Sequence, residues 1–278
     1  MNRVESKNVS RPILRYHGGK WLLAQWIISH FPRHRIYVEP FGGAASVLLQ
    51  KSRSYSEVYN DLDGEVVNLF RVVRDCGRDL LDVLRMTPFS RDEFNLSYNT
   101  SVDPIEQARR TVIRSFMGFA SGLQSHQRTG FRSCSNRSGT TPARDWVNYP
   151  DALEGIIERL QGVVIENRDA LDVISQHDTP DTLHYIDPPY VLNTRFKGQS
   201  TRIYAEEMMD QDHENLCQAI QGLQGAVVVS GYDNEIYNDL LTGWHKYYRK
   251  AFADGAKARM EVLWTNRMKP NLQTAIAL

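Results

Sequence analysis

The alternation of apolar runs and polar breaks near the start of the chain predicts helices and strands in turn. Residues 20–31 (KWLLAQWIISHF) carry apolar side chains at helical spacing and end before Pro32, which predicts a helix. Residues 35–43 (RIYVEPFGG) predict a buried strand that enters a glycine turn, and 44–51 (AASVLLQK) a helix. A second strand at 56–63 (SEVYNDLD) and a helix at 64–75 (GEVVNLFRVVRD) follow. This β-α-β-α order indicates an α/β fold with a parallel, doubly wound sheet.

The pattern changes between about Arg71 and Leu160, where helical periodicity continues without strands. Within this stretch, residues 121–146 (SGLQSHQRTGFRSCSNRSGTTPARDW) form a polar segment that predicts a long loop. Strands resume with 162–167 (GVVIEN), 182–190 (TLHYIDPPY) and 225–232 (GAVVVSGY), and 261–266 (EVLWTN) is expected to close the sheet. We therefore expect a catalytic domain formed by residues 1–70 and 160–278, interrupted by an inserted helical domain at 71–159.

Composition places the chain among soluble globular proteins. It has 278 residues, 41% hydrophobic and 24% charged, and no apolar run of the roughly 18 residues that a membrane span requires. The polar N-terminus has no apolar segment typical of a secretion signal. The three cysteines are far apart and predict free thiols in a reducing compartment, without a metal site. We expect a cytoplasmic protein that needs neither a membrane nor a metal ion.

Charge is unevenly distributed although the net charge is zero. Between Ile105 and Pro150 seven arginines accompany only two acidic residues, Glu106 and Asp145. Arginine pairs with phosphate and also reads guanine edges, so this segment is a candidate for nucleic-acid contact. A solvated surface loop is the alternative interpretation.

The tetrapeptide Asp187-Pro188-Pro189-Tyr190 directly follows a predicted strand. Ligands of doubly wound sheets bind beyond the carboxyl ends of the strands, so a site is expected there. The two prolines have no N–H groups, so the carbonyls of Asp187 and Pro188 can point at a ligand without local competition. The Asp187 carboxylate and a backbone carbonyl both accept hydrogen bonds, which suits an amino group with two N–H donors. The ring of Tyr190 offers a face on which a base can stack. A simple strand-terminating turn is the alternative.

A glycine turn and an acidic strand end predict a second half of the site. In Glu39-Pro40-Phe41-Gly42-Gly43 the glycines allow a ligand to approach the backbone, and no phosphate-binding motif is present. Asp61 ends the next strand about 20 residues later, where a carboxylate can meet a ribose hydroxyl. The pair suits an adenosine-containing cofactor without a pyrophosphate. The segment Tyr16–Lys20 (YHGGK) reads by itself only as a loop before the first helix.

Taken in order, YHGGK, VEPFGGAASV, YNDLD and DPPY resemble the Dam-like group (alpha-group, D12 class) of N6-adenine DNA methyltransferases. The resemblance covers most of residues 11–75 and 160–266 and is poor between them. It implies the Rossmann-like fold of S-adenosylmethionine-dependent methyltransferases, with the inserted domain recognising the target. It also implies methyl transfer from S-adenosylmethionine to adenine N6 in double-stranded DNA, with the base flipped out of the helix.

The resemblance also assigns residues. Catalysis is expected at Asp187, Pro188, Pro189 and Tyr190. Cofactor binding is expected at Tyr16, Gly18, Gly19, Lys20, Glu39, Pro40, Phe41, Gly42, Gly43, Asp61 and Asp169. Tyr16 stands where the family usually has Trp, and Ala170 follows Asp169 where many members have Phe.

DNA contacts are expected from the arginine-rich segment and from the residues after the catalytic motif. The candidates are Arg128, Arg132, Asn136, Arg137, Arg144, Arg195 and Lys197. The segment around residues 126–144 is expected to order only on DNA. Two other functions stay open at this point, methylation of adenine in RNA and DNA binding without catalysis. The sequence gives neither the target sequence nor the oligomeric state.

Overall fold

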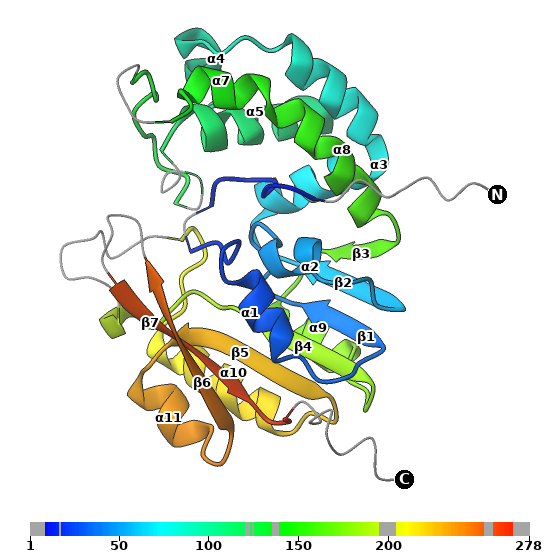
Figure 1. Ribbon diagram of the computed structural model, residues 1–278, viewed down its shortest axis with the longest axis vertical. Helices are drawn as coiled ribbons and strands as arrows, with labels where there is room; N and C mark the ends of the chain where they lie inside the picture. Colours follow the sequence, from blue (N-terminus) through cyan, green and yellow to red (C-terminus); the bar gives the residue numbers. More distant parts are fainter. Residues whose placement is uncertain are drawn as a thin grey trace.

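The computed structural model describes residues 9–16, 18–119, 123, 125–134, 139–194, 204–252 and 258–268. A seven-stranded sheet with the order β3-β2-β1-β4-β5-β7-β6 lies at the centre of the lower part of the molecule (Figure 1). The parallel strands are β1 (Ile36–Glu39), β2 (Ser56–Asn60), β3 (Val163–Glu166), β4 (Thr182–Ile186) and β5 (Ala226–Tyr232). Their apolar residues are largely buried, as expected for strands covered on both faces.

The strand order reverses between β1 and β4, because the chain builds outward from β1 through β2 and β3 and later from β4 to β5. This is the doubly wound arrangement that the sequence predicts. In such sheets the crevice at the carboxyl ends of the two central strands is the usual ligand site. The segments that follow β1 and β4 carry the glycine turn and Asp187, so both predicted motifs reach the same crevice.

The far edge of the sheet differs from the prediction. The strand predicted at 261–266 is part of β7 (Ala258–Thr265), which does not close the sheet but lies between β5 and β6 (His245–Phe252). β7 is antiparallel to both neighbours.

The edge strand β6 is missing from the sequence prediction because Lys246, Arg249 and Lys250 interrupt its apolar pattern. Charged residues are common on edge strands, where they discourage pairing with other chains.

Helices surround the sheet and extend beyond it. Those near the strands are α1 (Ala24–Ser29), α2 (Ser46–Gln50), α9 (Ala170–Gln176), α10 (Asp210–Gln221) and α11 (Glu235–Leu240). Between β2 and β3 the structure places α3 (Gly64–Met86), α4 (Arg91–Leu96), α5 (Pro104–Met117), α7 (Pro142–Val147) and α8 (Tyr149–Leu160). Figure 1 shows α4, α5 and α7 at the end of the molecule away from the sheet. No helix in the described ranges is long and apolar enough to cross a membrane.

The helices between β2 and β3 share a core with the sheet. One cluster of buried side chains contains Tyr37 and Tyr185 from the sheet together with Phe116, Trp146 and Tyr149 from the helices. Phe116 and Tyr149 lie with ring centroids 4.3 Å apart. The division of the chain into a catalytic and a target-recognition domain at 70/71 and 159/160 stays a prediction.

The predicted loop at 121–146 is wrong at its C-terminal end, which is helical. Thr141 begins α7 as its N-cap, its hydroxyl accepting a hydrogen bond from the Arg144 N–H at 3.3 Å, and Pro142 follows in the first turn. Trp146 is buried and its indole N–H donates to the Thr87 carbonyl at 2.8 Å. The polar composition of the segment obscured this capping signal.

The N-terminal segment 9–16 is attached to these helices by contacts across long stretches of sequence. The Arg15 N–H donates to Ser115 Oγ at 2.7 Å, and the Tyr149 hydroxyl donates to the Ile13 carbonyl at 2.8 Å. Arg11 and Arg15 both pair with Asp145, at 3.1 and 3.4 Å. Residues 13–16 therefore connect the helical region to the crevice of the sheet.

Candidate functional site

One cavity of about 580 Å³ opens at the carboxyl ends of the central strands, within the size range of small-molecule sites. It is lined by every residue predicted from the sequence for cofactor binding or catalysis, together with residues that the prediction missed. The predicted set is Tyr16, Gly18, Gly19, Lys20, Glu39, Pro40, Phe41, Gly42, Gly43, Asp61, Asp169, Asp187, Pro188, Pro189 and Tyr190. The fold thus brings both predicted half-sites into one pocket, while the role of each residue stays a prediction.

The glycine turn after β1 is held in place by residues at the end of β2. The Gly43 N–H donates to Asp61 Oδ2 at 2.7 Å, and the Tyr59 hydroxyl donates to the Gly43 carbonyl at 2.8 Å. Gly43 has a φ of +47°, which favours glycine. At Gly42 the requirement is steric, because an added Cβ would lie 2.1 Å from Cε2 of Tyr59. The close approach of a ligand to these glycines, expected from the sequence, stays a prediction.

Carboxylates concentrate on this side of the pocket. Asp61 accepts hydrogen bonds from the Gly43 and Asp63 N–H groups, and burial raises its pKa to about 6 against the effect of these bonds. Glu39 is 2% exposed and accepts from the Tyr37 hydroxyl at 2.7 Å. Burial, together with the charge of Asp187, raises the pKa of Glu39 to about 8. Asp169 begins α9 as its N-cap. Glu39, Asp61 and Asp169 thus line the pocket together, and burial favours the protonated form of the first two.

The DPPY segment follows β4, and its four residues line the same pocket. Asp187 Oδ1 accepts a hydrogen bond from Ser230 Oγ at 2.7 Å and lies 3.0 Å from Lys20 Nζ. Lys20 Nζ also lies 4.7 Å from the ring centroid of Tyr190. Lys20, expected in the cofactor site, therefore contacts the predicted catalytic residues directly. The Tyr190 hydroxyl donates to Glu261, and the Tyr190 ring meets Tyr232 edge to face at 4.6 Å.

Three residues beside Asp187 and Tyr190 were not found from the sequence. Ser230 and Tyr232 end β5, next to β4, so the same strand-end argument that identified Asp187 could have found them. Glu261 reaches the site because β7 runs antiparallel to β5 and pairs Glu261 with Tyr232. No local sequence signal reveals that pairing.

The predicted DNA-contact residues have different environments. Arg128 and Arg144 are exposed, and the Arg128 guanidinium lies 4.8 Å from the ring centroid of Tyr98. Arg132 differs from these two residues, because its side chain is 6% exposed and donates to the Phe116 carbonyl at 2.9 Å. The expectation that the segment orders only on DNA stays a prediction. The remaining candidates lie outside the described residues: Asn136, Arg137, Arg195 and Lys197.

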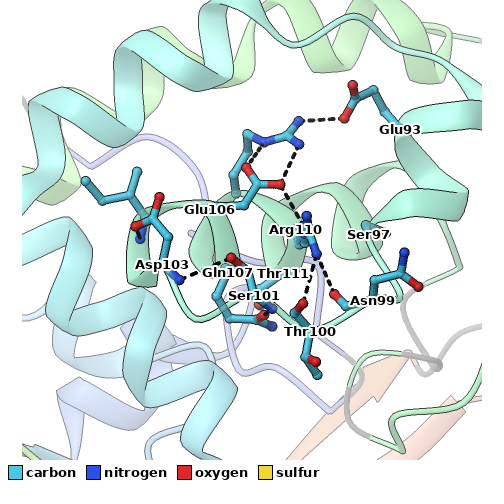
Figure 2. A network of polar contacts seen from close by, with 12 residues as sticks. Glu93, Ser97, Asn99, Thr100, Ser101, Asp103, Glu106, Gln107, Arg110 and Thr111 are labelled. Carbon is cyan, nitrogen blue, oxygen red and sulfur yellow. Dashed lines mark hydrogen bonds and ion pairs between the residues drawn. The ribbon is translucent and has the colours of Figure 1, made fainter.

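The positive charge of residues 105–150 is partly neutralised by acidic residues. Glu106 lies within the segment, whereas Glu93 and Glu65, the partner of Arg114, lie earlier in the chain. Glu106 bridges Arg109 and Arg110 at 2.6 and 2.7 Å, and Glu93 pairs with Arg109 at 2.6 Å (Figure 2). Arg110 also donates to the Asn99 carbonyl at 2.9 Å. These arginines hold the helices together, so Arg128 and Arg144 are better placed to contact an anion.

Comparison with known proteins identifies relatives of this chain. The sequence model of the D12 class N6 adenine-specific DNA methyltransferases matches residues 16–254. The DNA adenine methylase of Escherichia coli (strain K12) is 23% identical over 97% of this chain and 95% of that protein. The DNA adenine methylase of Haemophilus influenzae is 24% identical over 86% of each chain. That of Serratia marcescens is 32% identical over a shorter match, 36% of this chain and 39% of that protein. With the family matching across most of its length, this chain belongs to the D12 class of N6 adenine-specific DNA methyltransferases.

Proposed function

We propose that this protein transfers a methyl group from S-adenosylmethionine to the N6 amino group of adenine in duplex DNA. The observation that supports this most strongly is the single pocket that joins the glycine turn and Asp61 to Asp187 and Tyr190. A methyl transfer by direct displacement requires the donor and the acceptor nitrogen in line, and a shared pocket meets that requirement. Membership of the D12 class gives the reaction and the substrate base.

The residues that line the cofactor half of the pocket support S-adenosylmethionine as the methyl donor. Asp61 and Asp169 supply acceptors for hydroxyl and amino groups. The glycine turn lets a ligand approach the backbone closely, and Tyr16 contributes an aromatic wall. When bound, S-adenosylmethionine supplies a methyl group activated by its positively charged sulfur.

The other half of the pocket suits a flipped adenine. The Asp187 carboxylate and the Pro188 carbonyl accept the two N–H groups of the amino group, which directs the nitrogen lone pair toward the methyl donor. Tyr190 provides a stacking face, an interaction of about 1–3 kcal/mol in other base–aromatic contacts. This offsets part of the few kcal/mol that extruding a base costs.

Exposed arginines of the helical region are the proposed DNA contacts. Arg128 and Arg144 are placed to pair with phosphates and so to position the duplex. Asn136, Arg137, Arg195 and Lys197 stay candidates for the same role. We propose that residues 71–159 recognise the target and that the remainder carries out the transfer.

The test is single-turnover methylation of duplex DNA by wild type and by Asp187→Ala. The variant should lose methyl transfer and keep S-adenosylmethionine affinity, because Asp187 acts on the amino group. Asp178→Ala is the matched control: Asp178 precedes β4 at its other end and accepts the Gln224 and Gly225 N–H groups. It should lose stability but not turnover by the folded protein. Near-normal turnover of Asp187→Ala would refute the assignment, and a preference for structured RNA over duplex DNA would support the RNA alternative.

A further inference from the structure

A buried lysine lies between two carboxylates that come from different strands. Lys20 is 6% exposed, and its Nζ lies 3.0 Å from Asp187 Oδ1 and 3.8 Å from Glu261 Oε1. The same Nζ donates to the Gly18 carbonyl at 2.8 Å. The three N–H bonds of the ammonium group thus have three oxygen neighbours. This arrangement fixes Lys20 against the DPPY segment.

Burial and charge act in opposite directions on this group. Burial alone would lower the pKa of Lys20, but the negative charges of Asp187 and Glu261 raise it above its ordinary value. Burial raises the pKa of Glu261, and Lys20 opposes that change. Each group therefore favours the charged form of the other, and removing one takes away the partner that compensates a charge held away from water.

Glu261 has a second contact that connects this pair to the base-stacking residue. Its carboxylate accepts the hydrogen bond from the Tyr190 hydroxyl, while Lys20 lies over the Tyr190 ring. Lys20 at the same time contacts Asp187. The first and last residues of the DPPY segment are therefore held by one ion pair from outside it, and the Tyr190 and Tyr232 rings make an edge-to-face contact.

We propose that Lys20 and Glu261 are positioning residues for methyl transfer, fixing the Asp187 carboxylate and the Tyr190 ring in the arrangement that receives the adenine. The inference rests on the proposed function, because it assigns the adenine to Asp187 and Tyr190. It moves Lys20 from the cofactor to the substrate side of the reaction. A displacement of about 1 Å in such groups can cost about 100-fold in rate.

A second cluster in the same protein provides a matched control. Lys51 pairs with Glu57 at 2.5 Å and lies 4.5 Å from the ring centroid of Tyr37, so it too combines a buried lysine, a glutamate and a tyrosine ring. Lys51 and Glu57 do not line the pocket. Glu57→Gln should therefore lower thermal stability but change neither S-adenosylmethionine affinity nor the single-turnover rate of the folded protein.

The experiment compares Lys20→Met, Glu261→Gln and Tyr190→Phe. Each is measured for thermal stability, S-adenosylmethionine affinity by calorimetry and single-turnover methylation of duplex DNA. We expect rates lower by roughly 10–100-fold, by analogy with outer-shell partners of other active groups, and cofactor affinities within about twofold of wild type. The rate loss in the double variant Glu261→Gln/Tyr190→Phe should be much smaller than the product of the two single losses, because both substitutions break the same hydrogen bond between Tyr190 and Glu261.

The outcomes separate this inference from the proposed function. A parallel loss of cofactor affinity and rate in Lys20→Met would make Lys20 a cofactor ligand and overturn the inference. Wild-type rates in Glu261→Gln and Tyr190→Phe, or independent effects in the double variant, would also overturn it. In both cases an inactive Asp187→Ala leaves the proposed function standing. Tyr190→Phe removes only a hydroxyl, so it keeps the test decisive if a charge variant does not fold.

Discussion

Gly42→Ala should distort the glycine turn, because the added methyl group would meet the ring of Tyr59. An added Cβ would lie 2.1, 2.6 and 2.7 Å from three ring carbons of Tyr59, whereas ordinary contacts begin at 3.4 Å. The ring must therefore move by more than about 1 Å. Tyr59 is fully buried and stacks on Phe70 with ring centroids 4.2 Å apart, so it has little room to move.

The magnitude follows from two contributions. Overpacking a buried site costs about 1–3 kcal/mol. Displacing Tyr59 also breaks its hydrogen bond to the Gly43 carbonyl, at about 1 kcal/mol. The expected loss of about 2–4 kcal/mol corresponds to a Tm lower by roughly 5–15 °C for a chain of this size. Since Gly43 lines the pocket, cofactor affinity should fall on the order of tenfold or more.

Calorimetric unfolding and S-adenosylmethionine titration measure both effects. Gly222→Ala is the control, since Gly222 has a φ of −86° and an added Cβ would have no neighbour nearer than 3.9 Å. It should leave Tm and affinity unchanged. In a Tyr59→Leu background the Gly42→Ala change should cost much less, because the ring is gone. An unchanged Tm and affinity in Gly42→Ala, or an equal cost in both backgrounds, would refute the reasoning.

Three further changes test other parts of the structure. The pKa of Glu39 is about 8, against an ordinary 4.5, so between these pH values the folded protein keeps a proton that the unfolded chain releases. This contribution to stability is complete below about pH 4.5 and is lost as the pH rises through 8. Glu39→Gln should therefore flatten the fall of Tm over that range, and equal slopes of Tm against pH in wild type and variant would contradict this. Gly43→Val places a β-branched residue at a φ of +47° with its Cβ 3.2 Å from Cε1 of Tyr16, and should abolish cofactor binding in calorimetry, which unchanged affinity in a folded variant would exclude. Arg132→Ala should lower the unfolding free energy by about 1–3 kcal/mol and therefore lower Tm, because the Phe116 carbonyl loses its donor, whereas Arg128→Ala should keep Tm and reduce the salt dependence of DNA binding. The reverse pattern in thermal unfolding and in DNA titrations at several salt concentrations would show that the assignment is wrong.

The sequence was sufficient for features that depend on local pattern. The runs at 36–39 and 226–232 are apolar and β-branched, which predicts buried strands, and they form β1 and β5. The pocket was predictable because Gly43 and Asp187 each follow a strand, and parallel strands end at one edge of a sheet.

Features that depend on distant partners could not be predicted. Glu261 joins the site through the pairing of β7 with β5, and β7 itself is surrounded on both sides only because β6 pairs with it. The burial of Arg132 depends on the carbonyl of Phe116, which no pattern around residue 132 reveals. Likewise the sequence does not reveal that Arg109 forms an ion pair with Glu93, which lies on a different helix.

The attachment of residues 13–16 to the helices determines the order in which the protein can assemble. Ile13 and Arg15 are bound by Tyr149 and Ser115, which follow 136 and 100 residues later. At translation rates of roughly 5–20 residues per second, roughly 7–27 s separate the synthesis of the first pair of partners. The pairing of β1 with β4 requires a still longer stretch of chain to be synthesised, because Val38 pairs with His184. The pocket is thus completed late in folding, and a ligand bound in it can stabilise a nascent chain only after the central strands have met.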